Sequence, residues 1–347
     1  MVEQSRILIV GCGGIGGVIA TKLNAAKMVE VHAVSTNPEI LRSVSQDGFR
    51  LTGLDGPLTA HGPIHSDIPK GTFDVVLLAT RPPQAEEAAR QAVASLHPDG
   101  VMVVLQNGLC EPRIAAIAGP ERTVGGIVSF GASMYTPGTF ELTARGGITL
   151  GSIDGKSTPR IDRLQQVLRP VGSIQITENL LGARYSKLAL NCAVSGLGTV
   201  AGVQLGTLIG QTSARNLAIE VMCEVVKIGR AEGVDIEPIA GTFDLNWLAD
   251  PHASRSGPHH WVRHAMLLAV GLKYRRLRSS MLRALERGRS PAVEFLNGEV
   301  VNRGETHSID TPYNRAIRDT VLRIAAKEIE SDLAHIDTIR ATNSKTA

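Results

Sequence analysis

A lysine, an asparagine and a serine follow one another at four-residue intervals in the apolar stretch RYSKLALNCAVSGLG, residues 184–198. On a helix, Lys187, Asn191 and Ser195 drift by only about 40° per step, so all three side chains can line one cavity. A buried ammonium group loses hydration worth several kcal/mol unless it is paired or reaches solvent. Lys187 could therefore be a proton donor in a cleft, or it could extend to solvent while Asn191 bonds a neighbouring backbone group.

A second polar group follows the apolar run VMVVL, residues 101–105, where the chain reads Gln106-Asn107-Gly108. If this run is a parallel strand, Asn107 lies at its carboxyl end, the edge at which doubly wound sheets bind ligands. An Asn-Gly turn without any ligand is the alternative. The sequence alone leaves both interpretations open.

A glycine-rich turn lies in IVGCGGIGGVIA, residues 9–20, with Gly11, Gly13 and Gly16 in G-x-G-x-x-G spacing. The triplet follows a strand pattern directly and opens a helical one. Glycines let a pyrophosphate approach the backbone, and the helix N-terminus offers free N–H groups to the phosphates. We therefore expect dinucleotide contacts from this turn, with Gly14 and Ile15 included.

The end of the second strand decides between the two nicotinamide dinucleotides. An NAD-selective site normally carries a carboxylate there, about 20 residues beyond the glycines, for the ribose 2′-hydroxyl. This chain reads Ser35-Thr36-Asn37 instead. Hydroxyl and amide groups can donate to a 2′-phosphate, and Arg81 or Arg42 could supply a cation. We expect NADP(H), held in part by Ser35, Thr36 and Arg81.

The elements that must position these residues alternate between strand and helix patterns in the first half of the chain. This alternation predicts an α/β fold whose N-terminal part is a Rossmann doubly wound sheet. A turn at residues 54–57 predicts a hairpin insertion. Segments 122–142 and 146–152 look like antiparallel strands that extend the sheet. The expected central strands are residues 6–11, 29–35, 74–80 and 101–106.

After about Thr177 the periodicity becomes helical, which predicts an all-helical C-terminal domain. We expect an NADP(H)-binding domain over residues 1–177, a helical substrate and catalytic domain over 178–337, and a frayed tail over 338–347. The region from Phe243 to Pro258 is rich in Pro, His, Gly and Ser, which indicates a loop.

Composition narrows the function classes. The chain has 347 residues, 43% of them hydrophobic, and no apolar run reaches the ~18 residues that a membrane span needs. The N-terminus lacks a signal-peptide pattern, and the net charge of +3 is too small to indicate nucleic-acid binding. We expect a cytoplasmic protein with neither membrane nor nucleic acid as partner.

Cysteines and histidines do not indicate a metal site. The four cysteines are scattered without a C-x-x-C pair, which is typical of reduced thiols. Among the histidines between residues 252 and 264, His260 and His264 are the only pair at helical ligand spacing. We expect no metal, and a basic run at residues 273–278 is expected to be a solvated helix face.

Five motifs in order resemble the ketopantoate reductases, or 2-dehydropantoate 2-reductases, over nearly the whole chain. They are the glycine turn, QNG at 106–108, K-L-A-x-N-C at 187–192, SSML at 279–282 and FLNG at 295–298. The resemblance implies a Rossmann domain and a helical domain with the substrate in a cleft between them, and NADPH as hydride donor. The implied reaction reduces a 2-oxo acid, with ketopantoate as first candidate.

The same resemblance implies roles for single residues. Lys187 would be the general acid that protonates the carbonyl oxygen, and Asn107 would help to position both that lysine and the nicotinamide. Asn191 would hydrogen-bond the substrate, and Ser280 would contact it. Ser195 stands where the family often has a second asparagine, and we expect a substrate contact there too.

One departure affects the substrate side. Where the family usually carries T-E-[IV]-[DE], this chain reads Pro291-Ala292-Val293-Glu294, so Ala292 replaces a glutamate. Glu294 lies roughly 200° around a helix from that position and cannot simply stand in.

This departure leaves several alternatives open. They are a D-2-hydroxyacid dehydrogenase of the mandelate type, which favours NAD, and a sensor that binds NADP(H) without turnover. The β-hydroxyacid dehydrogenases also pair a lysine with an asparagine, but SSML and QNG argue against them. A homodimer is possible.

Overall fold

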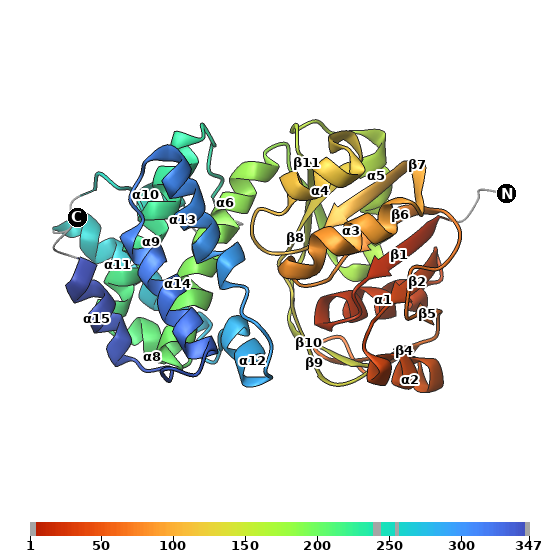
Figure 1. The fold of residues 1–347 in the computed structure, drawn as a ribbon, viewed down its shortest axis with the longest axis horizontal. Coiled ribbons are helices and arrows are strands. Elements are labelled where there is room, and N and C mark those ends of the chain that lie inside the picture. The colour runs from red at the N-terminus through yellow and green to blue at the C-terminus, as the bar shows by residue number, and fades with distance from the viewer. Residues whose placement is uncertain (1–4, 239–243, 254–256, 344–347) are drawn as a thin grey trace. The chain divides into compact units, whose positions relative to one another are not determined.

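A computed structural model describes residues 5–238, 244–253 and 257–343 of the chain (Figure 1). The chain divides into two compact units, residues 1–180 and residues 181–347. This division falls three residues after the boundary that we expect from the change in periodicity. Each unit is described below by itself.

The first unit is built on a twisted sheet whose eight described strands run in the order β12-β11-β8-β7-β6-β1-β2-β5. The six strands from β5 to β8 have the strand order of a dinucleotide-binding fold, with the switch point between β1 and β6. Neighbouring strands pair in parallel except β8 and β11. The strands are β1 (Arg6–Val10), β2 (Glu30–Val34), β5 (Ile64–His65), β6 (Phe73–Leu78), β7 (Leu96–Val104), β8 (Thr123–Val128), β11 (Gly147–Ser152) and β12 (Ser173–Ile176).

The predicted α/β fold is confirmed, and all four expected central strands are present as β1, β2, β6 and β7. Their continuous apolar runs are buried because helices cover the sheet, as expected for parallel strands. The helices of this unit are α1 (Gly14–Ala26), α2 (Pro38–Asp47), α3 (Ala85–Val93), α4 (Glu111–Ala118) and α5 (Pro159–Leu168).

A small second sheet packs on α1. The predicted hairpin is present as the antiparallel pair β3 (Phe49–Gly53) and β4 (Leu58–Ala60). It is joined by β10 (Thr139–Ala144) and β9 (Gly131–Thr136) in the order β4-β3-β10-β9. The expectation that residues 122–142 extend the main sheet is therefore right for β8 and wrong for β9 and β10.

Two buried phenylalanine rings hold the strands of this second sheet together. Phe49 and Phe140 stack with centroids 6.3 Å apart and are both fully buried. A Cβ on Gly17 of α1 would collide with the Phe140 ring, so the absence of a side chain there lets the sheet lie close to the helix. Burial of these rings stabilises strands that are far apart in sequence.

The described part of the second unit contains helices and no strands, as predicted. α9, which is buried along most of its length, contacts α8, α10, α13, α14 and α15. The helices are α6 (Leu180–Asn191), α7 (Leu197–Ala201), α8 (Leu205–Gly210), α9 (Thr212–Ala231), α10 (Leu245–Leu248), α11 (Pro258–Lys273), α12 (Ser280–Glu286), α13 (Asn297–His307), α14 (Pro312–Ala325) and α15 (Ala334–Asn343).

Two expectations about this unit need correction. The tail expected to be frayed forms α15 as far as Asn343, because Ile336 and Ile339 are buried and the helix packs on α9; residues 344–347 lie outside the described residues. The expected loop at residues 243–258 contains the short helix α10. Residues 243 and 254–256 of this segment lie outside the described residues. Within the described residues, no helix is both long enough and apolar enough to cross a lipid bilayer.

Candidate active site

The glycine turn after β1 is held by backbone packing. Gly11 has φ +103°, a conformation that favours glycine, and a Cβ there would lie 2.7 Å from the Thr80 backbone nitrogen. A Cβ on Gly16 would collide with the carbonyl oxygen of Gly11. These two glycines are therefore required by the turn itself, whether or not a ligand is present.

Gly13 is different, because a Cβ placed on it would have no atom within 4 Å among the described residues other than its chain neighbours. It precedes the first turn of α1, which Gly14 and Ile15 open, and no side chain caps this helix. Uncapped helix N–H groups that face an open space fit the pyrophosphate of a dinucleotide. The turn thus leaves at Gly13 the room that a phosphate would need.

Polar contacts tie the neighbouring strand ends to this turn. The Ala79 backbone N–H donates to the Val10 carbonyl at 2.8 Å, and the buried Gln106 amide donates to both the carbonyl and the hydroxyl oxygen of Thr80 at 3.2 Å. Asn107, the next residue, is exposed. The structure therefore places Asn107 at the carboxyl edge of the sheet, near the ends of β1 and β6. Thr80 and Gln106, which support this edge, were not predicted to take part.

The three residues after β2, Ser35, Thr36 and Asn37, differ in burial and in hydrogen bonding. The Ser35 side chain is buried and its hydroxyl accepts from the Asn37 backbone N–H at 3.3 Å, while Thr36 is exposed. The Asn37 side chain caps α2, because its Oδ1 accepts from the backbone N–H groups of Glu39 and Ile40. An asparagine before a proline at the first helical position is the sequence signal for such a cap.

The two arginines considered for a 2′-phosphate are both exposed. Arg81 precedes a short 3₁₀ turn at Pro82–Gln84, directly after the end of β6, and Arg42 lies on α2. In the segment that connects β2 to α2, residues 35–37, the chain has no carboxylate.

Lys187 and Asn191 lie one turn apart on α6, and both side chains are partly buried. Burial, and to a smaller extent the Arg184 guanidinium, lower the pKa of Lys187 to about 8. The Nδ2 atom of Asn191 is buried and has no hydrogen-bond partner among the residues that the structure describes. A buried amide donor without a partner is rare and indicates a group that is satisfied by something else, such as a ligand.

A π-helical turn, Cys192–Gly196, follows Asn191 directly and includes Ser195. Such turns are rare and occur often at functional sites. Here two hydroxyls support the turn, since Thr199 Oγ1 and Ser279 Oγ donate to the Ser195 carbonyl at 2.7 and 2.9 Å. The Ser195 side chain itself is partly exposed. Lys187 and Asn191 thus lie on α6, and Ser195 lies in the irregular turn that follows it.

The two serines of SSML differ. Ser279 is buried and caps α12 by accepting from the Leu282 backbone N–H at 3.2 Å. Ser280, the expected substrate contact, is the first residue of that helix and is exposed. The structure therefore brings the start of α12 to the π turn through Ser279, a residue that we did not single out.

A buried network of amide and carboxylate groups lies against the π turn at Gly196. Asn297 Nδ2 donates to Asn314 Oδ1 at 2.9 Å, and Asn314 Nδ2 donates to Glu224 Oε2 at 2.7 Å. A Cβ on Gly196 would lie 2.9 Å from Asn297 Oδ1. Burial raises the pKa of Glu224 to about 7, although its carboxylate also accepts the Tyr313 and Asn314 backbone N–H groups at the start of α14. In the sequence, only the FLNG motif pointed to this network.

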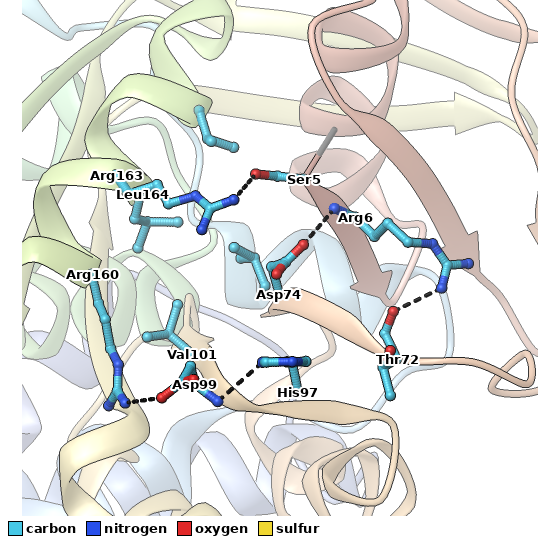
Figure 2. Close-up of a pocket in the computed structure, with 12 residues that line it drawn as sticks. Ser5, Arg6, Thr72, Asp74, His97, Asp99, Val101, Arg160, Arg163 and Leu164 are labelled. Carbon is cyan, nitrogen blue, oxygen red and sulfur yellow. Dashed lines mark hydrogen bonds and ion pairs between the residues drawn. The ribbon is translucent and has the colours of Figure 1, made fainter. Parts of the chain in front are cut away.

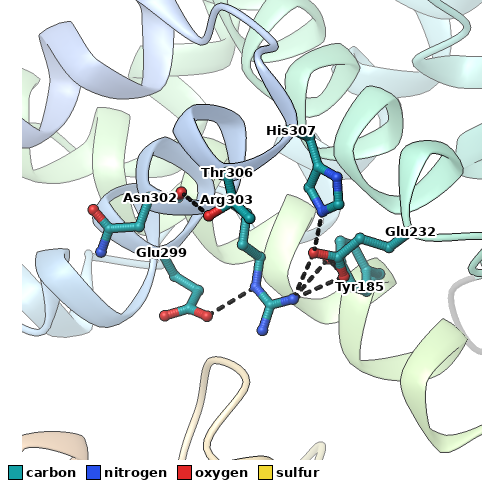
Figure 3. A network of polar contacts seen from close by, with 7 residues as sticks. All are labelled: Tyr185, Glu232, Glu299, Asn302, Arg303, Thr306 and His307. Carbon is teal, nitrogen blue, oxygen red and sulfur yellow. Dashed lines mark hydrogen bonds and ion pairs between the residues drawn. The ribbon is translucent and has the colours of Figure 1, made fainter.

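A second network anchors the helix that carries Lys187 (Figure 3). The Tyr185 hydroxyl donates to Glu232 at 2.5 Å, and Arg303 binds Glu232 at 2.7 Å and Glu299 at 2.8 Å. His307 also lies 3.2 Å from Glu232. The contacts join α6 to α13 and to the end of α9, so they restrict movement of the helix on which Lys187 lies.

Ala292, which replaces the family glutamate, is partly buried at the start of a 3₁₀ turn, Val293–Phe295. Glu294 is exposed, and its carboxylate lies against Gly298, where a Cβ would collide with it. Glu294 is thus turned toward the first turn of α13.

A polar cavity of about 450 Å³ lies elsewhere in the first unit, at the amino ends of β1 and β6 (Figure 2). Its arginines already contact protein groups, with Arg163 bound to the Ser5 hydroxyl at 2.9 Å and Arg160 to Asp99 at 3.1 Å. Ligands of doubly wound sheets bind at the opposite, carboxyl edge.

The histidine pair also has protein partners. His264 Nδ1 accepts from Arg215 at 2.9 Å, its Nε2 lies 3.1 Å from Asn216 Oδ1, and burial lowers the pKa of His264 to about 4. Among the residues that the structure describes, no three histidine, cysteine or acidic side chains gather closely enough to hold a metal ion.

Comparison with known proteins assigns both units to one family. The model of the ketopantoate reductase PanE/ApbA family matches residues 7–155, and the model of its C-terminal domain matches residues 179–325. A 2-dehydropantoate 2-reductase of Nostoc sp. is 30% identical over 243 residues, which cover 67% of this chain and 75% of that protein.

Solved structures agree on the fold. A PanE/ApbA family ketopantoate reductase from Ralstonia eutropha JMP134 has a TM-score of 0.78 at 22% identity and covers 93% of this chain and 99% of its own. A D-mandelate dehydrogenase in complex with NADH and anilino(oxo)acetate has a TM-score of 0.79 at 18% identity, covering 96% and 99%. With the matches to both domains, these comparisons show that the chain belongs to the ketopantoate reductase family of oxidoreductases.

Proposed function

We propose that this protein reduces a 2-oxo acid to a 2-hydroxy acid with NADPH, and that ketopantoate is the first candidate substrate. The observation that carries the proposal is the pair on α6. Lys187 is an ammonium group with a pKa of about 8, and one turn further on Asn191 has a buried amide nitrogen with no partner in the described part of the chain. A 2-oxo acid offers the carbonyl and carboxylate oxygens that such donors bind.

The chemistry assigned to Lys187 is proton donation. When bound, NADPH supplies the hydride that reaches the carbonyl carbon. The Lys187 Nζ then gives one proton to the carbonyl oxygen, which becomes the hydroxyl group, and the amine is left neutral. A pKa near the working pH makes both protonation states accessible, which suits a general acid. Asn191 Nδ2 donates to a substrate oxygen and so holds the carbonyl group in place.

The remaining predicted site residues take roles that fit their positions. Ser195 and Ser280 offer hydroxyls at and beside the π turn, and we assign them to substrate binding. Asn107, exposed at the carboxyl edge of the sheet, is assigned to the nicotinamide and the lysine. The scheme requires that Lys187 and the nicotinamide reach the same carbonyl group.

The glycine turn is assigned to the cofactor pyrophosphate, with Gly13 as the open position. Preference for NADP(H) rests on the absence of a carboxylate at residues 35–37, together with the exposed Thr36 hydroxyl and the exposed Arg81 guanidinium. Ser35 is assigned a backbone or indirect part in this contact, because its side chain is buried.

The test is NADPH oxidation by the purified protein with a panel of 2-oxo acids, using Lys187→Ala and, as matched control, Lys273→Ala. Lys273 is an exposed lysine at the end of α11. Loss of a general acid lowers kcat by about 10²-fold or more, and the control keeps the wild-type rate. An alanine variant at position 187 with full activity on the best substrate contradicts the role of the lysine.

A second candidate is a D-2-hydroxyacid dehydrogenase of the mandelate type. Ala292 favours it, because the glutamate typical of ketopantoate reductases is missing at that position. The ratio of NADPH to NADH turnover, measured on ketopantoate and on benzoylformate, separates the two candidates. Binding of NADPH without oxidation by any 2-oxo acid would indicate a sensor instead.

A further inference from the structure

The polar cavity of the first unit lies at the end of β1 opposite to the glycine turn, so it takes no part in the reaction proposed above (Figure 2). Its volume of about 450 Å³ falls within the range of small-molecule pockets, roughly 300–1,000 Å³. Most of its walls come from β1, β6, β7 and α5, so the cavity belongs wholly to one unit. It has the size and the position of a second ligand site.

One part of the cavity lining is apolar. Val75 and Val101 are paired on the neighbouring strands β6 and β7, and Leu164 and Val167 lie one turn apart on α5. All four side chains are buried, and none of them can form a hydrogen bond. This apolar wall fits an aliphatic group, which gains about fourfold in affinity for each methylene that leaves water.

Some of the charged groups around the cavity are neutralised by acidic or basic partners. Arg160 forms an ion pair with Asp99 at 3.1 Å. The Arg6 guanidinium forms an ion pair with Glu30 at 3.2 Å. These pairs balance their own charges, so they do not require a charged ligand.

Arg163 and Asp74 differ from those pairs. Arg163 Nη2 donates to the Ser5 hydroxyl at 2.9 Å, and Asp74 Oδ2 accepts from the Arg6 backbone N–H at 2.9 Å. Both partners are neutral, and within the described ranges neither side chain forms an ion pair. Arg163 extends from α5 and Asp74 from the start of β6, and both line the same cavity (Figure 2). One positive and one negative group thus face it with hydrogen-bonding capacity left.

We propose that this cavity binds an α-amino acid with an aliphatic side chain. The carboxylate of the amino acid accepts from Arg163, its ammonium group donates to Asp74, and its side chain lies on the apolar wall. Such a ligand balances both charges at once. A simple anion meets the Asp74 carboxylate and a simple cation meets the Arg163 guanidinium, so each of these suffers a like-charge contact that the zwitterion avoids.

Isothermal titration calorimetry of the whole chain with L-leucine and two analogues tests the class of ligand. 3-Methylbutylamine lacks the carboxylate, and 4-methylpentanoate lacks the ammonium group. The wild type binds L-leucine at least about tenfold more tightly than either analogue, because each analogue loses a hydrogen bond to a charged group. An analogue that binds as tightly as L-leucine overturns the proposal, and so does the absence of L-leucine binding at millimolar concentrations.

Two variants assign each charge of the ligand to its partner. Arg163→Gln keeps an amide donor for Ser5, and Asp74→Asn keeps an acceptor for the Arg6 backbone N–H, so both proteins fold, which urea unfolding checks. Arg163→Gln binds L-leucine about tenfold more weakly and loses the preference for L-leucine over 3-methylbutylamine. It keeps the preference over 4-methylpentanoate. Asp74→Asn shows the reverse pattern.

The matched controls are Arg169→Gln and Asp67→Asn, because both residues are exposed and neither lines the cavity. The controls bind L-leucine as the wild type does. If Arg163→Gln and Asp74→Asn also keep the wild-type affinity, L-leucine binds elsewhere on the protein and the proposal is wrong. The readout is binding alone, so the result does not depend on which 2-oxo acid the protein reduces.

Discussion

The Asn191 amide nitrogen is the most informative single atom of the site. A buried donor without a partner is destabilising by about 1 to 3 kcal/mol, so a fold gains by replacing it with an apolar group. Among the described residues, Asn191 Nδ2 is such a buried donor without a partner. The Asn297 amide nitrogen, in the same unit, donates to Asn314 Oδ1 at 2.9 Å. Substitutions at Asn191 and at Asn297 therefore separate an effect on substrate binding from an effect on the stability of the fold.

We expect Asn191→Leu to lower kcat/KM for the best 2-oxo acid by about 10- to 100-fold, because a substrate hydrogen bond is lost. Its free energy of unfolding in urea does not fall, since no hydrogen bond within the protein is broken. The control Asn297→Leu is destabilised by ~1 to 3 kcal/mol, because Asn314 loses its partner. An Asn191→Leu variant with wild-type activity would show that the amide does not bind substrate.

Residue types and spacing were enough to single out Lys187 and Asn191, and they could not distinguish Ser279 from Ser280. Both serines stand at the start of a predicted helix, and only the fold shows that Ser279 is buried against Thr199. The contact between Asn297 and Asn314 was also hidden, because it depends on how α13 and α14 pack.

At the scale of elements, the glycine turn allows a sharp comparison of two neighbouring positions. We expect Gly13→Ala to leave the free energy of unfolding within about 0.5 kcal/mol of the wild type, because its Cβ collides with no atom of the described residues. The same Cβ occupies the space assigned to the pyrophosphate, so the Kd for NADPH rises at least about tenfold. Gly16→Ala, in contrast, destabilises the fold through its collision with Gly11.

Urea unfolding and fluorescence titration with NADPH check both variants. If Gly13→Ala binds NADPH as tightly as the wild type does, the pyrophosphate does not lie against this residue, and the cofactor assignment of the turn has to be changed.

The elements that could be predicted are those with a strong local pattern. The apolar runs of β1, β2, β6 and β7 and the helical periodicity after Thr177 needed no tertiary information. The small sheet could not be predicted in full, because β3 pairs in parallel with β10, with Arg50 opposite Thr139. The π turn after Asn191 was likewise invisible, since it arises where side chains from α7 and α12 bind the Ser195 carbonyl.

At the scale of the whole molecule, Glu224 makes stability depend on pH. Its folded pKa of about 7 lies above the ordinary value of 4.5, so the folded protein keeps a proton that the unfolded chain loses. The contribution of the Glu224 proton to the free energy of unfolding, ~3 kcal/mol in total, is present in full below pH 4.5. It is lost as the pH rises to about 7.

We therefore expect the free energy of unfolding of the wild type, relative to that of Glu224→Gln, to fall between pH 4.5 and pH 7. Urea denaturation of both proteins at several pH values measures this difference. The contributions of the other titrating groups to the free energy of unfolding cancel, because both proteins contain these groups. A constant difference across this range would mean that the Glu224 carboxyl keeps its ordinary pKa in the folded protein.

The central claim is that Lys187 is the proton donor, and the pH dependence of kcat/KM for 2-oxo acid reduction tests it most directly. The ammonium form is required, and its pKa is lowered to about 8, so the rate is level below pH 7 and falls about tenfold per pH unit above pH 8. The slower Lys187→Ala variant shows no such fall. The same decline near pH 8 in the alanine variant would assign it to another group and contradict the account.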